Sequence, residues 1–445
     1  MPLSWNEIKS RAIAFSQEWE DETSEDAEAK SFWDGFFHVF GISRRRVATF
    51  EQSVKKADNK QGFIDLLWKG VILVEHKSRG KSLDKAMQQA KDYFPSNEAK
   101  GNAAVHCVII GFGLQDIENK RVFDYVNIKG EPTERKVKNI NPYLAEGNDL
   151  IILKRNQPIG NIPEMLKGSQ PTDGGNLLMT EEEKTEYVIQ EPSGEKFIKP
   201  FISADEFLNG KKRWCFWLKD IQPNELKKLP LLSDRVSKVR KMRLSSTKQS
   251  TVKWADFPTL FTENRQPNTD YLLVPRVSSE NRKYIPIGFF ESSVIASDSC
   301  ITIPNATLYL FGILTSEMHI TWVKYVCGRL KSDYRYSNTI VYNNYPFPEN
   351  VNEKQKQKVE TAAQAVLDTR VKYPDSSLAD LYDPLTMPPD LVKAHQILDK
   401  AVDLCYRPQP FVSELNRIEF LFSQYEALNA PLLKPEKKKR TKKSS

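Results

Sequence analysis

The sequence has few of the residues that build zinc centres or disulfide frameworks, and those it has are scattered. No two of its five cysteines lie at metal-ligand spacing, and its five histidines form no H-x-x-x-H pair. An odd, dispersed set of cysteines is typical of reduced thiols, so we expect a cytoplasmic protein. We see no signal peptide and no apolar run close to the roughly 18 residues of a membrane span. The sequence therefore favours neither a secreted nor a membrane protein.

The chain is long enough for several packed domains. Its 445 residues predict two or three domains. A hydrophobic content of 40%, with 23 Phe, 16 Tyr and 8 Trp, is ample for their cores. The net charge of +7 does not by itself require a nucleic-acid partner, so the distribution of charge matters more.

Residues 62–77 are the most informative stretch, because they read as two strands joined by a tight turn at residues 69–70. Asp65 lies on the first strand, and Glu75 and Lys77 close the second. Alternate residues of a strand point to one face, so Glu75 and Lys77 project together, and the hairpin brings Asp65 near them. Two carboxylates and an ammonium arranged in this way can bind a divalent metal and position a water for attack on phosphate.

The alternative is a surface salt bridge at a strand end. The bare Glu-x-Lys triplet is common here, as in residues 98–100 and 225–227. The triplet at 75–77 differs because it ends an apolar, β-branched run that follows a strand with an Asp.

The flanking segments add a helix on each side of the hairpin. Residues 27–42 predict an amphipathic helix with an aromatic face, and residues 83–94 predict another that Pro95 closes. Gln89 and Tyr93 lie four residues apart and therefore share one face of the second helix.

This order of helix, strand, strand and helix resembles the PD-(D/E)xK nuclease superfamily. The resemblance implies that Asp65, Glu75 and Lys77 are catalytic and that Asp65 and Glu75 bind Mg²⁺. Gln89 and Tyr93 match the superfamily's helical Gln-x-x-x-Tyr element.

From about residue 96 the chain resembles a second group, the MmeI-like (type IIL/IIG) restriction-modification enzymes. These enzymes carry a nuclease, an adenine methyltransferase and a target-recognition domain on one chain. The phrases that carry the resemblance are residues 97–112, 138–144, 167–176, 213–220, 273–279, 295–299 and 326–336.

Two motifs of the resembled methyltransferases are absent. The Gly-rich turn that binds S-adenosylmethionine is missing, and so is Asn-Pro-Pro-Phe/Tyr, since residues 141–144 lack the second proline. We infer a deletion of the methyltransferase core with its junction near residues 94–96. We therefore expect no S-adenosylmethionine binding, although a name given by similarity would be that of an adenine-specific DNA methyltransferase. A separate methyltransferase subunit is a possible partner.

The resembled target-recognition domain implies double-stranded DNA as the partner of residues 200–350. Basic residues bring phosphate affinity. For each of them an ordinary solvated charge is the alternative, and Trp214, Phe216 and Trp217 are more typical of a core than of base stacking. The candidate DNA contacts are Arg213, Arg235, Lys238, Arg240, Arg243, Arg276, Arg329, Lys331, Arg335 and Tyr336.

We therefore predict an α/β and α+β multidomain protein. Its expected parts are a nuclease-like αβ core at 1–128, a connecting region at 129–199, a mixed α/β target-recognition domain at 200–350, a helical region at 351–433 and a disordered basic tail at 434–445. Strands at 103–112 and 122–128 could complete the nuclease sheet. The expected function is a metal-dependent DNA endonuclease with its own recognition domain. The alternative is a remnant or split component of an adenine methyltransferase that binds DNA without activity of its own.

Overall fold

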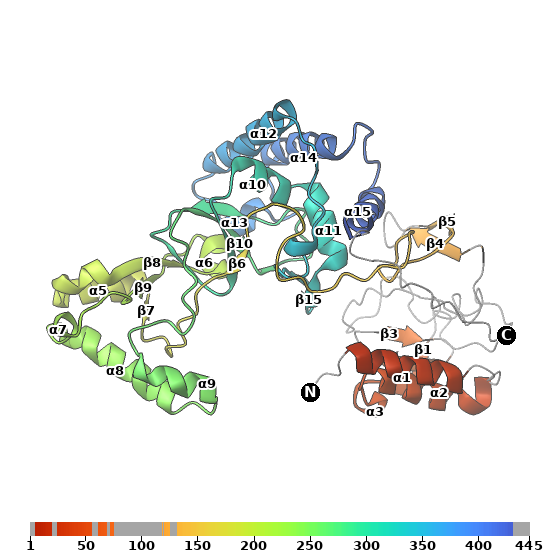
Figure 1. The fold of residues 1–445 in the computed structure, drawn as a ribbon, viewed down its shortest axis with the longest axis horizontal. Helices are drawn as coiled ribbons and strands as arrows, with labels where there is room; N and C mark the ends of the chain where they lie inside the picture. The colour runs from red at the N-terminus through yellow and green to blue at the C-terminus, as the bar shows by residue number, and fades with distance from the viewer. Residues whose placement is uncertain are drawn as a thin grey trace, which may run out of the picture. The chain divides into compact units, whose positions relative to one another are not determined.

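The structure is a computed structural model that describes residues 5–19, 25–55, 61–68, 72–74, 118, 120–124 and 131–429. The chain forms two compact units, residues 1–137 and residues 138–445. Figure 1 traces both units, which are described separately below. Across the described residues, no helix has the length and apolar character that a membrane span requires.

The first unit begins with two helices, α1 (Trp5–Glu18) and α2 (Glu25–Val39), followed by the short α3 (Arg44–Val47). The ring of Phe15 on α1 meets that of Phe32 on α2 with centroids 5.1 Å apart. Gly35 permits this approach, because a Cβ there would come within 2.9 Å of the Phe15 ring. The prediction of an aromatic helix over 27–42 is confirmed by α2.

Three antiparallel strands follow these helices: β1 (Thr49–Lys55), β2 (Gln61–Trp68) and β3 (Ile72–Val74), in the order β1-β2-β3. Trp33, Phe37, Ala48 and Leu66 form the buried core between helices and sheet. Leu66 pairs with Val74, which confirms the predicted hairpin.

A separate pair of strands, β4 (Lys120–Asp124) and β5 (Thr133–Val137), completes the described part of this unit. The partner of β4 is β5, with Val122 opposite Arg135. We had considered that residues 122–128 extend the sheet of β1–β3. Within the described residues β4 pairs with β5 and does not join that sheet. The other segment considered for that sheet, 103–112, and the predicted helix 83–94 lie outside the described residues.

The second unit contains a four-stranded sheet in the order β13-β8-β9-β7. Its strands are β7 (Leu178–Met179), β8 (Ile198–Ile202), β9 (Trp214–Phe216) and β13 (Ile295–Ala296). The associated helices are α5 (Glu181–Gln190), η1 (Pro192–Phe197), α6 (Ala204–Asn209), α7 (Pro223–Leu226), α8 (Pro230–Leu244), α9 (Gln249–Val252) and η2 (Lys253–Asp256). Thr180 and Glu183 form the capping box of α5.

A second four-stranded sheet has the order β12-β10-β14-β6. It is built from β6 (Leu166–Lys167), β10 (Tyr271–Pro275), β12 (Gly288–Phe290) and β14 (Cys300–Pro304). Every residue of β10 is buried, as expected for a central strand covered on both faces. Because β6 and β7 are strands of these two sheets, residues 138–199 belong to this unit and do not form the connecting region that we predicted.

Helices α10 (Leu308–Leu314) and α11 (Glu317–Val326) lead into a small sheet of order β11-β16-β15. Its strands are β11 (Val277–Ser278), β15 (Gly328–Leu330) and β16 (Asp333–Arg335), and the turn η3 (Tyr342–Asn344) follows. The remaining helices are α12 (Glu353–Val371), α13 (Leu378–Leu381), α14 (Pro389–Tyr406) and α15 (Glu414–Asn429). They confirm the predicted helical region, and in Figure 1 α12 and α14 lie beside α10.

These C-terminal helices share one core with the second sheet. Gly312 on α10 lies so close to α12 that a Cβ would meet Val359 at 2.6 Å. The carboxylate of Asp399 on α14 lies in this core, accepting hydrogen bonds from the Tyr284 hydroxyl and the Glu317 backbone N–H, each at 2.7 Å. Burial raises the pKa of Asp399 to about 6.

The raised pKa of Asp399 predicts a pH dependence of stability. An unfolded chain has an Asp pKa near 3.9, so the folded protein holds this proton more tightly. The stabilisation from Asp399 is then fully present below about pH 4 and is lost as the pH rises through about 6. The free energy of unfolding of the wild-type chain, relative to Asp399→Asn, should fall by roughly 3 kcal/mol between these limits.

Urea denaturation across this pH range measures the difference. Asp375→Asn, which changes an exposed carboxylate, is the matched control and should give no such trend. A wild-type chain and an Asp399→Asn variant with parallel pH profiles would contradict the assignment.

Candidate nuclease hairpin and DNA-recognition surface

Asp65 lies on β2, on the less buried face of the β1–β3 sheet. Ile64 and Leu66 are 1% and 0% exposed and point into the core, whereas Phe63 is 52% exposed. Asp65 alternates with the buried pair and is half-buried on the side of Phe63. Its carboxylate is therefore on a face that a ligand can approach.

The sequence analysis did not consider Glu51, which falls opposite Asp65 in the β1–β2 register. β1 pairs Phe50 with Leu66 and Gln52 with Ile64, so Glu51 is the β1 residue across from Asp65. Glu51 has φ of +49°, a conformation that non-glycine residues seldom adopt. Its carboxylate forms an ion pair of 2.7 Å with Lys30 on α2. Only the strand pairing reveals this neighbour, because 14 positions separate the two acids in sequence.

The other four predicted catalytic residues, Glu75, Lys77, Gln89 and Tyr93, lie outside the described residues. The predicted turn at 69–70 does so as well. Within the part of the chain that the structure describes, no three His, Cys, Asp or Glu side chains form a group that could hold a metal. Asp65 is the one predicted catalytic residue that the structure describes, and its carboxylate is an oxygen ligand of the kind that Mg²⁺ prefers.

In the second unit the β15–β16 hairpin presents basic side chains to solvent. Tyr334 and Tyr336 are 5% and 2% exposed, so alternation along β16 turns Arg335 outward. Lys331, in the two-residue turn with φ of +57°, and Arg329 are exposed too. The Arg329 guanidinium lies over the Tyr334 ring at 4.3 Å and donates to the backbone carbonyl of Ser332.

Three further candidates are exposed but have acidic neighbours. Arg213 lies 3.4 Å from the Glu206 carboxylate, Lys238 lies 2.7 Å from Asp234, and Arg240 lies 3.9 Å from Asp256. The pairs of Lys238 and Arg240 are exposed on both sides and contribute little to stability, so these two cations can exchange their partners for phosphate. Glu206, the partner of Arg213, is buried, so Arg213 also compensates a buried carboxylate.

Two half-buried candidates bind the protein's own backbone. Arg235 donates to the carbonyl oxygens of Asn176 and Leu178 at 3.2 and 3.4 Å. Arg276 donates to the carbonyl of Asp298 at 2.9 Å. Both arginines fix neighbouring loops.

The prediction was wrong for Arg243 and Tyr336, because both side chains are buried. Arg243 is 0% exposed, and its guanidinium donates to backbone carbonyls of residues 171, 172, 254, 257 and 260 at 2.8–3.0 Å. The Tyr336 hydroxyl lies 2.8 Å from Nε2 of the buried His319. Burial lowers the pKa of His319 to about 3, so that imidazole is neutral.

The aromatic residues 214, 216 and 217 follow the expected pattern. Phe216 is 0% exposed and Cys215 beside it is equally buried. Trp214 and Trp217 are half-buried and pack against the same core. Lys184 covers the Trp214 ring at 3.5 Å.

Comparison with known proteins places this arrangement in a family. Three family models match the chain: the MmeI N-terminal domain over residues 10–108, the MmeI target recognition domain over 146–349, and the MmeI C-terminal domain over 351–433. The chain belongs to the MmeI family.

The relatives are longer than this chain. "DNA methyltransferase A" of Bacillus subtilis (strain 168) is 40% identical over 339 residues, which are 76% of this chain and 38% of that protein. The solved type IIL restriction-modification enzyme MmeI, in complex with DNA, is 49% identical with a TM-score of 0.68, covering 75% of this chain and 45% of that one. The chain thus spans less than half the length of each relative.

The buried Arg243 should be a determinant of stability. Arg243→Met would remove the donor to five carbonyl groups and leave them buried without partners. We expect a loss of about 3–5 kcal/mol in the free energy of unfolding. Arg335→Met, which changes an exposed arginine, should stay within about 0.5 kcal/mol of wild type. Urea denaturation compares the two variants, and equal stabilities would refute the role given to Arg243.

Proposed function

We propose that this chain is a DNA-binding restriction-modification protein. Its N-terminal unit is a divalent-metal-dependent DNA endonuclease, and residues 146–349 recognise the target sequence. The observation that carries the nuclease assignment is the hairpin register, in which Leu66 pairs with Val74. Asp65 is the residue before Leu66 in the sequence, and Glu75 is the residue after Val74.

The register supports a shared site for the two acids. An antiparallel ladder that continues by one residue sets Asp65 opposite Glu75, and residues directly opposite each other share a face of the sheet. Asp65 is on the accessible face, and Lys77 follows Glu75 by two positions and would share that face by alternation.

The chemistry follows from these side chains. The carboxylates of Asp65 and Glu75 would hold Mg²⁺, which would supply a Lewis acid for phosphodiester hydrolysis. The Lys77 ammonium donates hydrogen bonds that orient the attacking water and offset charge on the phosphate. Gln89 and Tyr93 are proposed to help position the scissile strand, because they share one face of the predicted helix after the hairpin.

The segment between two of the matched regions argues against methyl transfer by this chain alone. Only residues 109–145 separate the regions matched by the N-terminal and target-recognition models. A cofactor-binding α/β domain needs on the order of 100 residues, so we propose that S-adenosylmethionine does not bind. The methyltransferase activity named for the Bacillus subtilis relative is accordingly not assigned here. A second candidate function is that of a DNA-binding component that acts with a separate methyltransferase subunit.

The nuclease assignment predicts metal-dependent cleavage that requires Lys77. In a plasmid-nicking assay, the wild-type chain should be active with Mg²⁺ and inactive with chelator. Lys77→Ala and Asp65→Asn should each lower the rate by at least about 100-fold, the scale of removing one group that stabilises developing charge.

Lys354→Ala on α12 is the matched control and should cleave at the wild-type rate. Unchanged DNA affinity of the Lys77 variant would show that the fold survives. Cleavage by Lys77→Ala at the control rate would remove Lys77 from the mechanism and favour the second candidate function.

The proposed recognition domain predicts different effects on DNA binding for two pairs of substitutions. Lys331→Ala with Arg335→Ala should relax sequence preference, since each lost base contact costs about 1–3 kcal/mol of discrimination. Lys238→Ala with Arg240→Ala should weaken binding to all duplexes alike and reduce the salt slope by about 0.9 per lost phosphate contact. Titrations of target and scrambled duplexes at several salt concentrations separate these outcomes. Identical behaviour of the two double variants would refute the division.

A further inference from the structure

The turn at residues 172–176, called the glycine turn below, lies between β6 and β7 and is open to solvent at its tip. Its backbone φ is positive at Thr172 (+45°), Gly174 (+64°) and Gly175 (+84°). Both glycines are exposed, and a Cβ on Gly175 would meet no described atom within 4 Å. Packing therefore does not fill the space over the tip, and a ligand can approach this backbone closely.

Two arginines of α8 hold the ends of the glycine turn. Arg243 donates to the carbonyl oxygens of Pro171 and Thr172 at 2.8 and 2.9 Å. Arg235 donates to the carbonyl oxygen of Asn176 at 3.2 Å. The turn is thus ordered before any ligand binds, which lowers the entropic cost of binding.

The glycine turn presents hydrogen-bond donors to solvent and keeps its acid inside. Asp173 is 4% exposed, and its carboxylate accepts a hydrogen bond from the Leu177 backbone N–H at 2.5 Å. Within the described part of the chain, the backbone N–H groups of Gly174 and Gly175 have no hydrogen-bond acceptor. Consecutive exposed N–H groups suit an anion, and backbone N–H groups are common donors to the phosphates of DNA.

Lys238 projects from α8 beside the glycine turn. On one side of it Arg235 contacts Asn176, and on the other a Cβ on Gly174 would meet Cγ of Met242 at 3.1 Å. Residues three and four apart share a face of a helix, so Lys238 lies on the same side of α8 as Arg235 and Met242. A long, exposed ammonium therefore lies next to the two free N–H groups.

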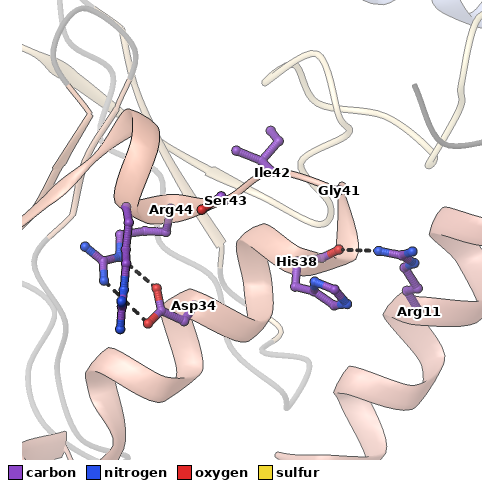
Figure 2. Close-up of a pocket in the computed structure, with 8 residues that line it drawn as sticks. Arg11, Asp34, His38, Gly41, Ile42, Ser43 and Arg44 are labelled. Atoms are coloured by element: carbon purple, nitrogen blue, oxygen red, sulfur yellow. Dashed lines mark hydrogen bonds and ion pairs between the residues drawn. The ribbon is translucent and has the colours of Figure 1, made fainter. Parts of the chain in front are cut away.

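The ion pair of Lys238 leaves its ammonium accessible. Lys238 lies 2.7 Å from Asp234, and the two side chains are 59% and 60% exposed. An ion pair that fixes the fold is different: Arg44 donates to both carboxylate oxygens of Asp34, at 2.7 and 3.4 Å, and its side chain is 13% exposed. Figure 2 shows Arg44 and Asp34 facing each other. Water competes for the exposed pair, so Lys238 can exchange Asp234 for a phosphate.

The geometry points to a phosphate site at the glycine turn, where the N–H groups of Gly174 and Gly175 and the Lys238 ammonium bind one phosphate of the DNA backbone. This inference rests on the proposed function as a DNA-binding protein and adds a contact made by the main chain. A phosphate contact carries no sequence information, so this site holds the recognition domain on any duplex.

Gly175→Asn tests the main-chain donors, because it places a side chain over the tip while Asn tolerates positive φ. Gly160→Asn is the matched control, since Gly160 is exposed, has φ of +81° and lies in equally open space. Fluorescence anisotropy of the full chain on two labelled duplexes of unrelated sequence, in chelator, measures affinity. Gly175→Asn should weaken binding to both by at least about 10-fold, the scale of one lost charge-assisted hydrogen bond, whereas Gly160→Asn should match wild type.

Lys238→Gln tests the ammonium without changing the turn. It should reduce the slope of log affinity against log salt by about 0.9, the value for one phosphate contact. Because both groups bind the same phosphate, Lys238→Gln should not change the slope further in a chain that already carries Gly175→Asn. Lys354→Gln on α12 is the matched control and should keep the wild-type slope. Urea denaturation checks that each variant is folded.

The outcomes separate this site from the proposed function. An affinity of Gly175→Asn equal to that of Gly160→Asn overturns the site, and so do effects of Gly175→Asn and Lys238→Gln that add in full. The proposed function stands in both cases if the wild-type chain binds duplexes with a salt-dependent affinity, and a wild-type chain without such binding overturns both.

Inorganic phosphate at constant ionic strength distinguishes the two sources of phosphate. A difference between wild type and Gly175→Asn that persists in millimolar phosphate supports the DNA backbone as the ligand. If millimolar phosphate abolishes that difference, the turn is a site for free anions and the inference fails.

Discussion

The buried carboxylate of Asp399 is the constraint on which the exposed recognition hairpin depends. It accepts hydrogen bonds from Tyr284 and from the first residue of α11, Glu317, and so fixes where that helix begins. Two residues further along α11, His319 contacts the Tyr336 hydroxyl. Tyr336 follows β16 directly, so the strand that bears Arg335 is held from the inside. The C-terminal helices thereby position the hairpin that we propose reads DNA.

Burial separates the basic side chains that stabilise the fold from those that we propose bind DNA. Arg243 is sealed within carbonyl groups of two loops, and desolvation by burial lowers the pKa of its guanidinium. A charge so placed stabilises the loops only while its hydrogen bonds are complete. Arg335 and Lys331 are exposed and are therefore free to meet phosphate or base edges.

The sequence analysis succeeded where the pattern was local. The aromatic face of α2, the 61–74 hairpin and helices α12 and α14 all follow from periodicity and turn chemistry. The burial of Arg243 could also have been predicted from helical periodicity. Leu232, Val236, Val239 and Arg243 recur on one face of α8 and are all buried. The same is true of Tyr336, which alternates with the buried Tyr334.

Other features depend on contacts between distant parts of the chain. The carbonyl groups around Arg243 come from two loops about 70 and 10–20 positions away in sequence, which no local rule joins. Residues 138–199 have the turn-rich composition of a linker, yet β6 and β7 supply edge strands to two sheets. Glu51 became a neighbour of Asp65 only through the register of β1 against β2.

The central claim is that one chain joins a target-recognition domain directly to a nuclease hairpin. Selection of bound duplexes from a random library by the full chain, in chelator, tests it most directly. The account predicts enrichment of one short motif, followed by Mg²⁺-dependent cleavage of duplexes that carry it. Salt-sensitive binding without any enriched motif, or an enriched motif that the chain binds but never cleaves, would contradict the account.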